Sequence, residues 1–479
     1  ITGTLMDKDT GEAVMVNGNP VTASQTFTSD GTKKVLDMHF NFDSSALGGK
    51  TVVVCEKLTY GDYVAATEED MENKDQTIYF PEIHTTATDR ETADHLTLAD
   101  SRAVITDTVT YTNLLKGETY TLSGVLMDKE TGKELLVDGE PVTQEMAFTA
   151  GRASGTKKLK FEFDTTGLAG KSFVVYETLT LEDVEVAEHK DINDEGQTIH
   201  IPAAQTTATD DSSKINVSEA KKEVSVTDTV AYRNLVPGKE YTVRGTAVDK
   251  ETGEPLTDAD GNELVSTAKF TAASADGSVD VKFTFDGTAM AGRSVVFFEN
   301  VYYTDKLIAV HADIDDEAQT VHIPLIFTSV KDKDTDSHMS LAGSDVTLTD
   351  TVAYRNLVPG KTYTISGTLM DQRTGKAVTV NGKAVTSSAD FTPDTADGET
   401  TVDFHINTNG LDDTTVVVFE KMFYGKAEIA AHEDINDKGQ TIYIPSVKTT
   451  AIDDKTATKL TLAEKDIHIT DTVAYRNLV

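Results

Sequence analysis

The feature that most constrains this chain is an internal repeat in which four similar segments recur. The segments are TVVVCEKLTY, SFVVYETLTL, SVVFFENVYY and TVVVFEKMFY, and a Gln-Thr pair follows the glutamate of each by twenty residues. The glutamates are Glu56, Glu177, Glu299 and Glu420, and the glutamines are Gln76, Gln197, Gln319 and Gln440. Successive glutamines are 121, 122 and 121 residues apart, and a fixed period of this kind indicates a tandem array of one domain type.

A second pair of anchors recurs near the start of each repeat. The segment TDTV has its aspartate 22 residues after a threonine; the aspartates are Asp107, Asp228, Asp350 and Asp471, and the threonines are Thr85, Thr206, Thr328 and Thr449. Runs such as YTLSGVLMDKETGK and LKFEFDTTGLAGK are rich in β-branched and aromatic residues and contain Gly and Asp turns. Strands at about ten-residue spacing, without helical periodicity, predict an all-β fold of tandem antiparallel β-sandwich domains.

The array is out of phase with the ends of the chain. Ile1 aligns with Leu122, past the first two strands of a repeat, and the final TDTVAYRNLV stops where PGK follows in two earlier repeats. We therefore interpret the chain as a fragment of a longer array. The predicted units are an incomplete domain lacking its first strands at 1–83, sandwich repeats at 84–203, 204–325 and 326–446, and the opening strands of a further repeat at 447–479.

Composition limits the partners that we expect. The chain holds 80 acidic and 43 basic residues, a formal charge of -37, and such a field repels nucleic acid and anionic lipid. Its apolar residues come in short runs, so we expect no membrane insertion. The single cysteine, Cys55, cannot form an internal disulfide, so extracellular domains of this kind need another means of stabilisation.

Five polar positions recur in every complete repeat and form the candidate site. They are a Thr on the first strand, an Asp on the second, a Glu late in the domain, and a His and a Gln at its end. The sets are Thr85, Asp107, Glu177, His189 and Gln197; Thr206, Asp228, Glu299, His311 and Gln319; and Thr328, Asp350, Glu420, His432 and Gln440. Because first and last strands of a sandwich can be neighbours, each Thr hydroxyl is expected to face a Gln side-chain amide.

This combination suits acyl transfer. A hydroxyl is a weak nucleophile and an amide nitrogen leaves only when protonated, so catalysis needs both a base and an acid. Two carboxyl groups buried together share one proton, which can polarise the amide oxygen or reach the departing amine, and a nearby histidine can accept the hydroxyl proton or orient the carboxylates. The product would be a Thr-Gln ester and ammonia; the sequence leaves the proton-transfer roles of Asp, Glu and His open.

Other chemistries fit the motifs less well. DINDEG resembles the start of a calcium-binding EF-hand loop, but its fifth position is Glu or Lys, no glutamate stands at position twelve, and no helices flank it. Zinc sites lack cysteines, a Lys-Asn isopeptide bond lacks the lysine on the first strand, and no hydrolase motif supports turnover on an outside substrate. We expect no metal site and no cofactor.

The TTA opening, the DTV strand, the VVFE segment and the terminal HxDxxDxxQT together resemble the Thr-Gln ester-bond domains, or VaFE repeats, of Gram-positive surface adhesins. The resemblance covers essentially the whole chain. It implies immunoglobulin-like domains that form an internal ester by themselves, in a single turnover, and stack as a cell-wall-anchored extracellular stalk. It assigns the nucleophile to Thr85, Thr206, Thr328 and Thr449, the acyl group to Gln197, Gln319 and Gln440, and supporting roles to the recurring Asp, Glu and His of each set. Asp194, Asp316 and Asp437 are further supporting candidates.

The incomplete unit departs from this pattern. Glu68 stands where the other repeats have histidine, and Asn73 stands where they have the supporting aspartate. Glu56, Gln76, Thr449 and Asp471 have no complete set of partners in this window, so whether Gln76 forms an ester stays open.

We expect a structural stalk whose partners are neighbouring domains of the same chain, with a host ligand bound by another region. The alternatives are a host-ligand-binding module and a calcium-rigidified spacer without crosslinks.

Overall fold

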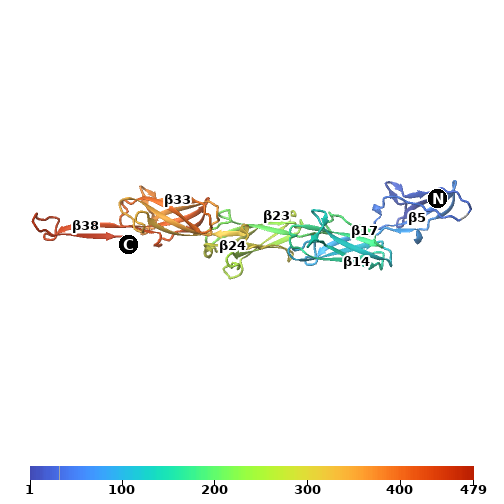
Figure 1. Cartoon of the computed structure of the whole chain (residues 1–479), viewed down its shortest axis with the longest axis horizontal. Coiled ribbons are helices and arrows are strands. Elements are labelled where there is room, and N and C mark those ends of the chain that lie inside the picture. Colours follow the sequence, from blue (N-terminus) through green and yellow to red (C-terminus); the bar gives the residue numbers. More distant parts are fainter. Residues whose placement is uncertain (32) are drawn as a thin grey trace.

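The structure, a computed structural model, describes residues 1–31 and 33–479 and consists of antiparallel β-sheets arranged end to end (Figure 1). Helical structure in the described residues is limited to four three-residue 3-10 turns: η1 (Ser45–Leu47), η2 (Lys74–Gln76), η3 (Thr288–Met290) and η4 (Glu317–Gln319). The prediction of an all-β array of sandwich domains is confirmed. No helix among the described residues is long and apolar enough to span a membrane.

The repeat at 84–203 has two sheets. A three-stranded sheet has the order β15-β9-β8, with β8 (Glu82–Asp89), β9 (Arg102–Thr112) and β15 (Gly155–Asp164). The second sheet contains β10 (Thr119–Asp128), β11 (Lys133–Glu134), β14 (Thr143–Thr149), β16 (Ser172–Leu181), β17 (Val184–His189) and β18 (Thr198–His200). The hairpin of β12 (Leu136–Val137) and β13 (Glu140–Pro141) projects from it.

The next two repeats reproduce this plan. In 204–325 the three-stranded sheet holds β19 (Ala203–Asp210), β20 (Val224–Arg233) and β23 (Gly277–Phe285), and the other holds β21 (Glu240–Asp249), β22 (Val265–Thr271), β24 (Arg293–Tyr303), β25 (Lys306–His311) and β26 (Thr320–Ile323). In 326–446 the first holds β27 (Leu325–Asp332), β28 (Asp345–Arg355) and β34 (Gly398–Asn407), and the second holds β29 (Tyr363–Asp371), β30 (Lys376–Ala377), β33 (Thr386–Phe391), β35 (Thr414–Tyr424), β36 (Ala427–His432) and β37 (Thr441–Ile444). A hairpin of β31 (Thr379–Val380) and β32 (Lys383–Ala384) completes the latter.

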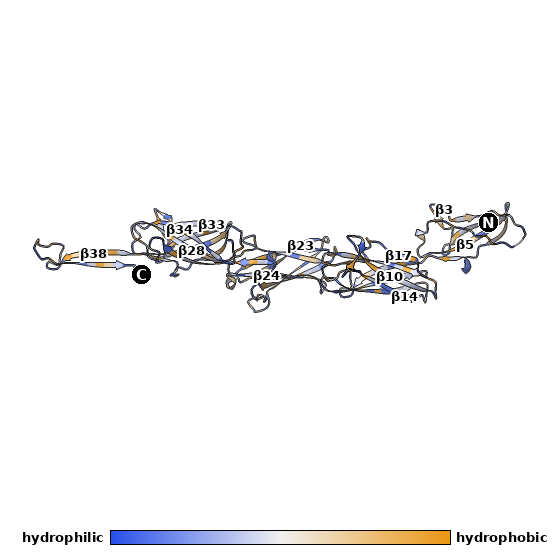
Figure 2. Ribbon diagram, in the orientation of Figure 1, coloured by the Kyte–Doolittle hydropathy of each residue, from blue (hydrophilic) through white to orange (hydrophobic). Residues whose placement is uncertain are grey.

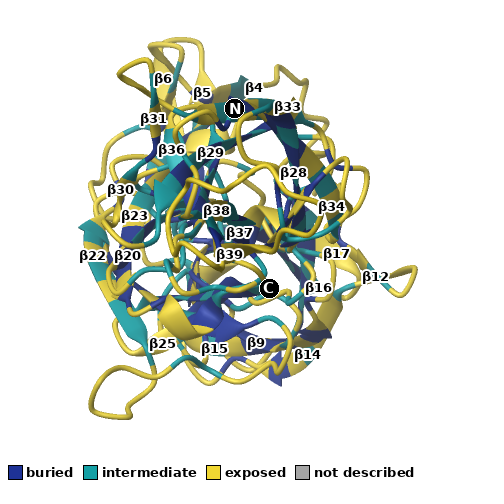
Figure 3. Cartoon of the chain, turned by 90° about the vertical axis from the view of Figure 1, so that its left-hand side faces the viewer, coloured by how far each residue is buried: buried dark blue, intermediate teal, exposed yellow. Residues whose placement is uncertain are grey.

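The sandwiches form because alternate side chains of each strand are apolar. In β10 every second residue is buried, and Tyr120, Leu122 and Leu126 point into the space between the sheets. There they meet the aromatic rings of Phe161 and Phe173 from the two sheets. Apolar and polar residues alternate along the ribbons in Figure 2, and in Figure 3 the buried residues lie along the strands whereas the loops are mostly exposed.

The two ends of the chain are built differently. The N-terminal unit, residues 1–83, has one main sheet made of β1 (Thr2–Asp7), β4 (Thr22–Ser24), β5 (Thr51–Tyr60), β6 (Tyr63–Glu68) and β7 (Thr77–Tyr79), with a small hairpin of β2 (Met15–Val16) and β3 (Asn19–Pro20). At the other end, the C-terminal strand pair, β38 (Ser446–Asp453) and β39 (Ile469–Arg476), forms a two-stranded sheet. Most of its residues are exposed.

Candidate functional site

The site of each complete repeat lies between its two sheets. In the first of them, Thr85 on β8 is paired with Val109 and Asp107 on β9 is paired with Ala87, so the threonine and the aspartate are diagonal neighbours on the inner face. Glu177 lies on β16 of the opposite sheet, and Gln197 immediately precedes β18. All four polar side chains are buried, which places them in a nearly water-free pocket.

The Thr-Gln pair predicted from the sequence comes together in all three complete repeats. The Nε2 atom of Gln197 donates to Oγ1 of Thr85, and the Nε2 atom of Gln440 donates to Oγ1 of Thr328. In the middle repeat the bond from Nε2 of Gln319 to Oγ1 of Thr206 is 2.7 Å. These contacts join residues 112 or 113 positions apart in the chain.

One carboxyl oxygen touches both members of the pair. Oε2 of Glu177 accepts from Oγ1 of Thr85 at 3.2 Å and from Nε2 of Gln197 at 2.6 Å. Oε2 of Glu420 likewise accepts from Oγ1 of Thr328, at 3.1 Å, and from Nε2 of Gln440. In the middle repeat, Oε2 of Glu299 accepts from Nε2 of Gln319 at 2.8 Å and its carboxyl is also within hydrogen-bonding range of Thr206.

The aspartate and the glutamate form a carboxyl pair across the sandwich. Within the described part of the chain, Oε1 of Glu177 and both oxygens of Asp107 lack a hydrogen-bond donor, and the two groups face each other at hydrogen-bonding range. One shared proton would link Oε1 of Glu177 to one of the aspartate oxygens. Burial, followed by the charge of the aspartate, raises the pKa of Glu177, so this glutamate holds the proton at neutral pH.

The same arrangement recurs in the other two repeats. Burial raises the pKa of Asp228 and Asp350, and the pKa of Glu299 and Glu420 is raised by burial and by their aspartate partners. The pKa of Asp107 is also raised by burial; the glutamate hydrogen bond and the nearby His189 oppose this rise. In each pair, therefore, the glutamate is the proton donor and the aspartate is the more acidic partner.

The predicted histidines lie beside the carboxyl pair and are held by the supporting aspartates. His189 is paired across the strands with Glu177, and its Nε2 atom is 2.8 Å from Oδ2 of Asp194. Oδ1 of Asp194 accepts from the backbone N–H of Gly196, next to the glutamine. The histidine contacts Asp194 and, at 3.4 Å, the carbonyl of Ile83, and through Asp194 it orients the glutamine turn.

The matching contacts are present in the other repeats. Nε2 of His311 is 2.9 Å from Oδ2 of Asp316, and Nε2 of His432 is 2.9 Å from Oδ2 of Asp437.

Sequence reasoning missed the apolar wall of the site. Gly124 is paired with Glu177 on the neighbouring strand, and a Cβ atom at this glycine would lie 2.7 Å from Cζ of Phe161. The ring fills the space that a side chain would occupy and shields the glutamate from water. Gly245 with Phe283 and Gly367 with Phe404 repeat the arrangement, and the recurring phenylalanine in LKFEF, VKFTF and VDFHI was the available signal.

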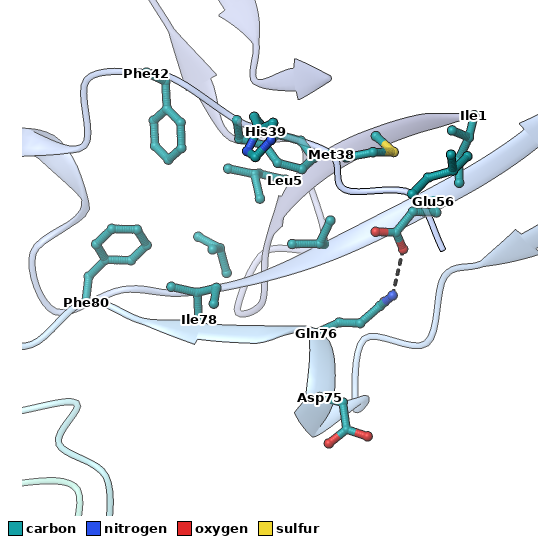
Figure 4. A pocket seen from close by; sticks show the side chains of 14 residues that line it. Ile1, Leu5, Met38, His39, Phe42, Glu56, Asp75, Gln76, Ile78 and Phe80 are labelled. Atoms are coloured by element: carbon teal, nitrogen blue, oxygen red, sulfur yellow. Dashed lines mark hydrogen bonds between the residues drawn. The ribbon is translucent and has the colours of Figure 1, made fainter. Parts of the chain in front are cut away.

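The N-terminal unit holds half of a site. Nε2 of Gln76 donates to Oε2 of Glu56 at 2.7 Å, and both side chains line an open pocket of about 830 Å³ together with Leu5, Phe40 and Phe80 (Figure 4). In the complete repeats the first two strands fill the corresponding space.

In this unit Glu68 and Asn73 stand at the positions of the histidine and the supporting aspartate. Nδ2 of Asn73 donates to Oε1 of Glu68 at 3.1 Å, so the residue at the aspartate position is here the donor.

The C-terminal strand pair holds the complementary half. Thr449 is paired with Val473 and Asp471 with Ala451, the register of the corresponding residues in the complete repeats. Both side chains are exposed, so neither contacts a glutamine. Across the described residues, no group of three or more His, Cys, Asp or Glu is placed to hold a metal ion.

The fold and the site define a protein of tandem β-sandwiches in which a threonine and a glutamine meet over a shared carboxyl group. The chain belongs to the family described as T-Q ester bond containing domain, whose model matches residues 1–80, 81–201, 202–323, 324–444 and 445–479. No curated protein matches the chain.

Two solved structures are similar in part. One is a bacterial adhesin from Mobiluncus mulieris containing intramolecular disulfide, isopeptide and ester bond cross-links, at 13% identity, with 57% of this chain and 97% of that chain covered and a TM-score of 0.21. The other is Escherichia coli alpha-2-macroglobulin activated by porcine elastase, at 11% identity, with 94% of this chain and 42% of that chain covered and a TM-score of 0.19. Similarities this weak carry no conclusion about function.

Proposed function

We propose that each complete repeat forms an ester between its threonine and its glutamine, releasing one ammonia, and that the array serves as a surface stalk. The observation that carries the proposal is the glutamate oxygen shared by nucleophile and leaving group. Oε2 of Glu177 contacts both the hydroxyl of Thr85 and the amide nitrogen of Gln197, so one atom can take a proton from the first and deliver it to the second.

The proposed reaction uses the carboxyl pair as a relay. As Oγ1 of Thr85 attacks Cδ of Gln197, its proton passes to Oε2 of Glu177, and the proton on Oε1 of the glutamate passes to Asp107. When the tetrahedral intermediate collapses, Oε2 gives its proton to the departing nitrogen and Asp107 returns the other. One C–O bond forms, one C–N bond breaks, and ammonia is the only other product. The contact of Oε2 with Nε2 supports protonation of the leaving amine over polarisation of the amide oxygen.

The histidine tunes this relay. His189 lies close enough to Asp107 for its positive charge to lower the pKa of that carboxyl. Its bond to Asp194 fixes the orientation of the ring. The reaction happens once per domain, because both the nucleophile and the acyl group are consumed.

The ester would close a loop of 112 residues in the first complete repeat. If it restricts the unfolded chain as a disulfide does, a loop of that length contributes about 4 to 5 kcal/mol to the free energy of unfolding. Tension that enters at the first strand and leaves at the last would pass through the covalent bond.

Membership of the T-Q ester family supports an extracellular surface location. We propose that the units 84–203, 204–325 and 326–446 stack as a cell-wall-anchored adhesin stalk, with neighbouring repeats as partners and a host ligand bound elsewhere in the protein.

The intact mass of the purified chain tests the ester. We expect a mass lower than that of the sequence by three ammonia molecules, and by two in Thr85→Ala, Thr206→Ala or Thr328→Ala after allowance for the substitution. Thr86→Ala is the matched control, because Thr86 is adjacent and exposed, and it should still lose three. An uncorrected sequence mass in the parent chain would contradict the proposal.

A further inference from the structure

An asparagine from each repeat reaches back into the unit before it. These residues follow the second strand of each repeat and adopt a left-handed backbone, with φ between 60° and 63°; they are Asn113, Asn234, Asn356 and Asn477. Asparagine tolerates this conformation better than most residues. We call each of them the Asn clamp of the joint that it crosses.

The clamp makes several hydrogen bonds across the joint. Nδ2 of Asn234 donates to the carbonyls of Lys171, at 2.6 Å, and Ile201, at 3.3 Å. Its Oδ1 accepts from Oγ of Ser172 at 2.9 Å and lies 2.9 Å from Nδ1 of His200. One side chain of the 204–325 repeat thus connects two strands of the preceding repeat.

The other joints repeat these bonds. Asn113 bonds the carbonyls of Lys50 and Phe80, Asn356 those of Arg293 and Ile323, and Asn477 those of Thr414 and Ile444. A Thr or Ser hydroxyl donates to the clamp's Oδ1 at each: Thr51, Ser294 and Thr415.

The clamped segments are those that carry the ester chemistry. Lys171 precedes β16, which bears Glu177, and Ile201 ends the segment that begins with Gln197. We call β18, β26 and β37, the strands that directly follow each glutamine, the acyl-donor strands. β18 is only three residues long, so its pairing with β16 is short and easily frayed unless its end is held.

The opposite flank of β18 is paired with a loop of its own repeat, residues 95–97, and this loop in turn packs against the next repeat. The N–H of His200 donates to the carbonyl of His95 at 2.8 Å, and the N–H of Thr97 donates to the carbonyl of His200 at 3.0 Å. Between them, Leu96 is fully buried and belongs to the apolar core of the following repeat. Val217 occupies the same place between 204–325 and 326–446.

We propose that each repeat is completed by the repeat that follows it, which holds the end of the acyl-donor strand through the Asn clamp, packs against the loop that pairs with the strand's other flank, and so speeds ester formation in its predecessor. The inference rests on the proposed function, because it concerns the rate of that ester. Each Asn clamp is a positioning residue for a reaction in a neighbouring domain.

The test uses the full chain carrying Asn234→Gly, which removes the amide and keeps the left-handed backbone accessible. The chain is made in a short cell-free pulse, sampled over time and quenched in denaturant, and the ammonia loss of each crosslinked peptide pair is followed by mass. Ester formation between Thr85 and Gln197 should slow about fivefold or more, because hydrogen bonds that hold the strand are lost. The ester between Thr206 and Gln319, in the repeat that contains Asn234, should form at the parent rate.

Asn113→Gly is the matched control. It lies in the same repeat as Thr85 and Gln197 but clamps the N-terminal unit, so it should leave that ester unchanged. Asn234→Asp, which keeps the acceptor oxygen and loses the donor, should slow the ester as Asn234→Gly does. A slowing confined to 204–325, equal slowing in both repeats, or no slowing would overturn the inference. A parent chain without ammonia loss would instead refute the proposed function.

Discussion

The N-terminal unit and the first complete repeat share one half of a site and differ in the other. Gln76 bonds Glu56 at 2.7 Å, as Gln197 bonds Glu177 at 2.6 Å, and Glu56 is paired with Glu68 in the register that pairs Glu177 with His189. The glutamate-glutamine contact therefore belongs to a single sheet and forms without the other.

The complete repeat adds a second sheet, and with it the reactive groups. β8 and β9 supply Thr85 and Asp107, and they close the pocket so that Glu177 is fully buried. In the N-terminal unit the corresponding pocket is open and Glu56 is only half-buried. The comparison teaches that the sheet bearing the acyl group is assembled independently, whereas the nucleophile and the elevated glutamate pKa both come from enclosure by the first two strands.

The largest effect is expected from Glu177→Gln, which keeps the shape of the side chain and removes its transferable proton. Ester formation in 84–203 should slow by a factor on the order of 100 to 10,000, the usual contribution of general acid-base catalysis. Repeat-specific mass measurement would show one ammonia retained. The exposed Glu185→Gln on the next strand is the control, and equal crosslinking in both variants would contradict the relay.

The second prediction concerns a double variant that gives the first complete repeat the Glu and Asn found at the equivalent positions of the N-terminal unit. The double variant His189→Glu with Asp194→Asn can keep one hydrogen bond with reversed polarity, but it replaces a positive charge near Asp107 with a negative one. The pKa of Asp107 should rise, so that a larger fraction of this carboxyl is already protonated at neutral pH and cannot take the proton of Glu177, and the ester should form more slowly. Time-resolved mass measurement would detect the slower ester. A parent-like rate would show that the histidine charge is unimportant.

The third prediction concerns pH in chains that lack the first crosslink. In Thr85→Ala, the raised pKa values of Glu177 and Asp107 mean that the folded repeat binds more protons than the unfolded chain. The contribution of these two groups to the free energy of unfolding of 84–203 should therefore be greatest at acidic pH and be lost as pH rises from about 4, where free carboxyls ionise, into the alkaline range.

Hydrogen exchange of the 84–203 peptides at several pH values checks this third prediction. Thr85→Ala combined with Glu177→Gln should show a flatter dependence, because one of the two shifted groups is absent. If the stability of the single variant, relative to that of the double variant, did not fall as pH rose, the raised pKa assigned to Glu177 would be wrong.

The smallest effect compares two glycines that each face a phenylalanine. A Cβ at Gly124 would meet Phe161 at 2.7 Å and Leu159 at 2.8 Å in a closed core, so Gly124→Ala should cost about 1 to 3 kcal/mol. A Cβ at Gly3 would meet Phe40 at 2.6 Å, but this ring lines the open pocket and can move. Gly3→Ala should therefore cost less than Gly124→Ala, as denaturant melting followed by repeat-specific hydrogen exchange would show.

The sequence was sufficient for the β-sandwich array and for the meeting of threonine with glutamine. The reason is that a fixed period exposes residues such as Thr85 and Gln197 that stay constant while the segments around them drift. The sequence left the role of His189 open. Its spacing of twelve residues from Glu177 places the two residues near each other but does not show which group the imidazole hydrogen-bonds. The bond to Asp194 depends on a local turn that only the structure shows.

The Asn clamps and the apolar wall of the site were not predicted, for a different reason. Asn234 stands in a polar turn, where asparagine is common, and its partners Lys171 and Ile201 lie in another repeat. Nothing local to the residue indicates a contact across a joint. Phe161 reads as an ordinary core residue, and its relation to Gly124 is defined only when the two sheets are packed.

Every joint uses an asparagine at the equivalent position and the carbonyls of two equivalent residues. The start of any repeat can therefore make the same hydrogen bonds to the end of any other. A gene that gained or lost a whole copy would encode an array whose new junction already fits, with no compensating change on either side. Length is therefore the property of this molecule that can vary most freely, and with it the distance over which such an array can reach.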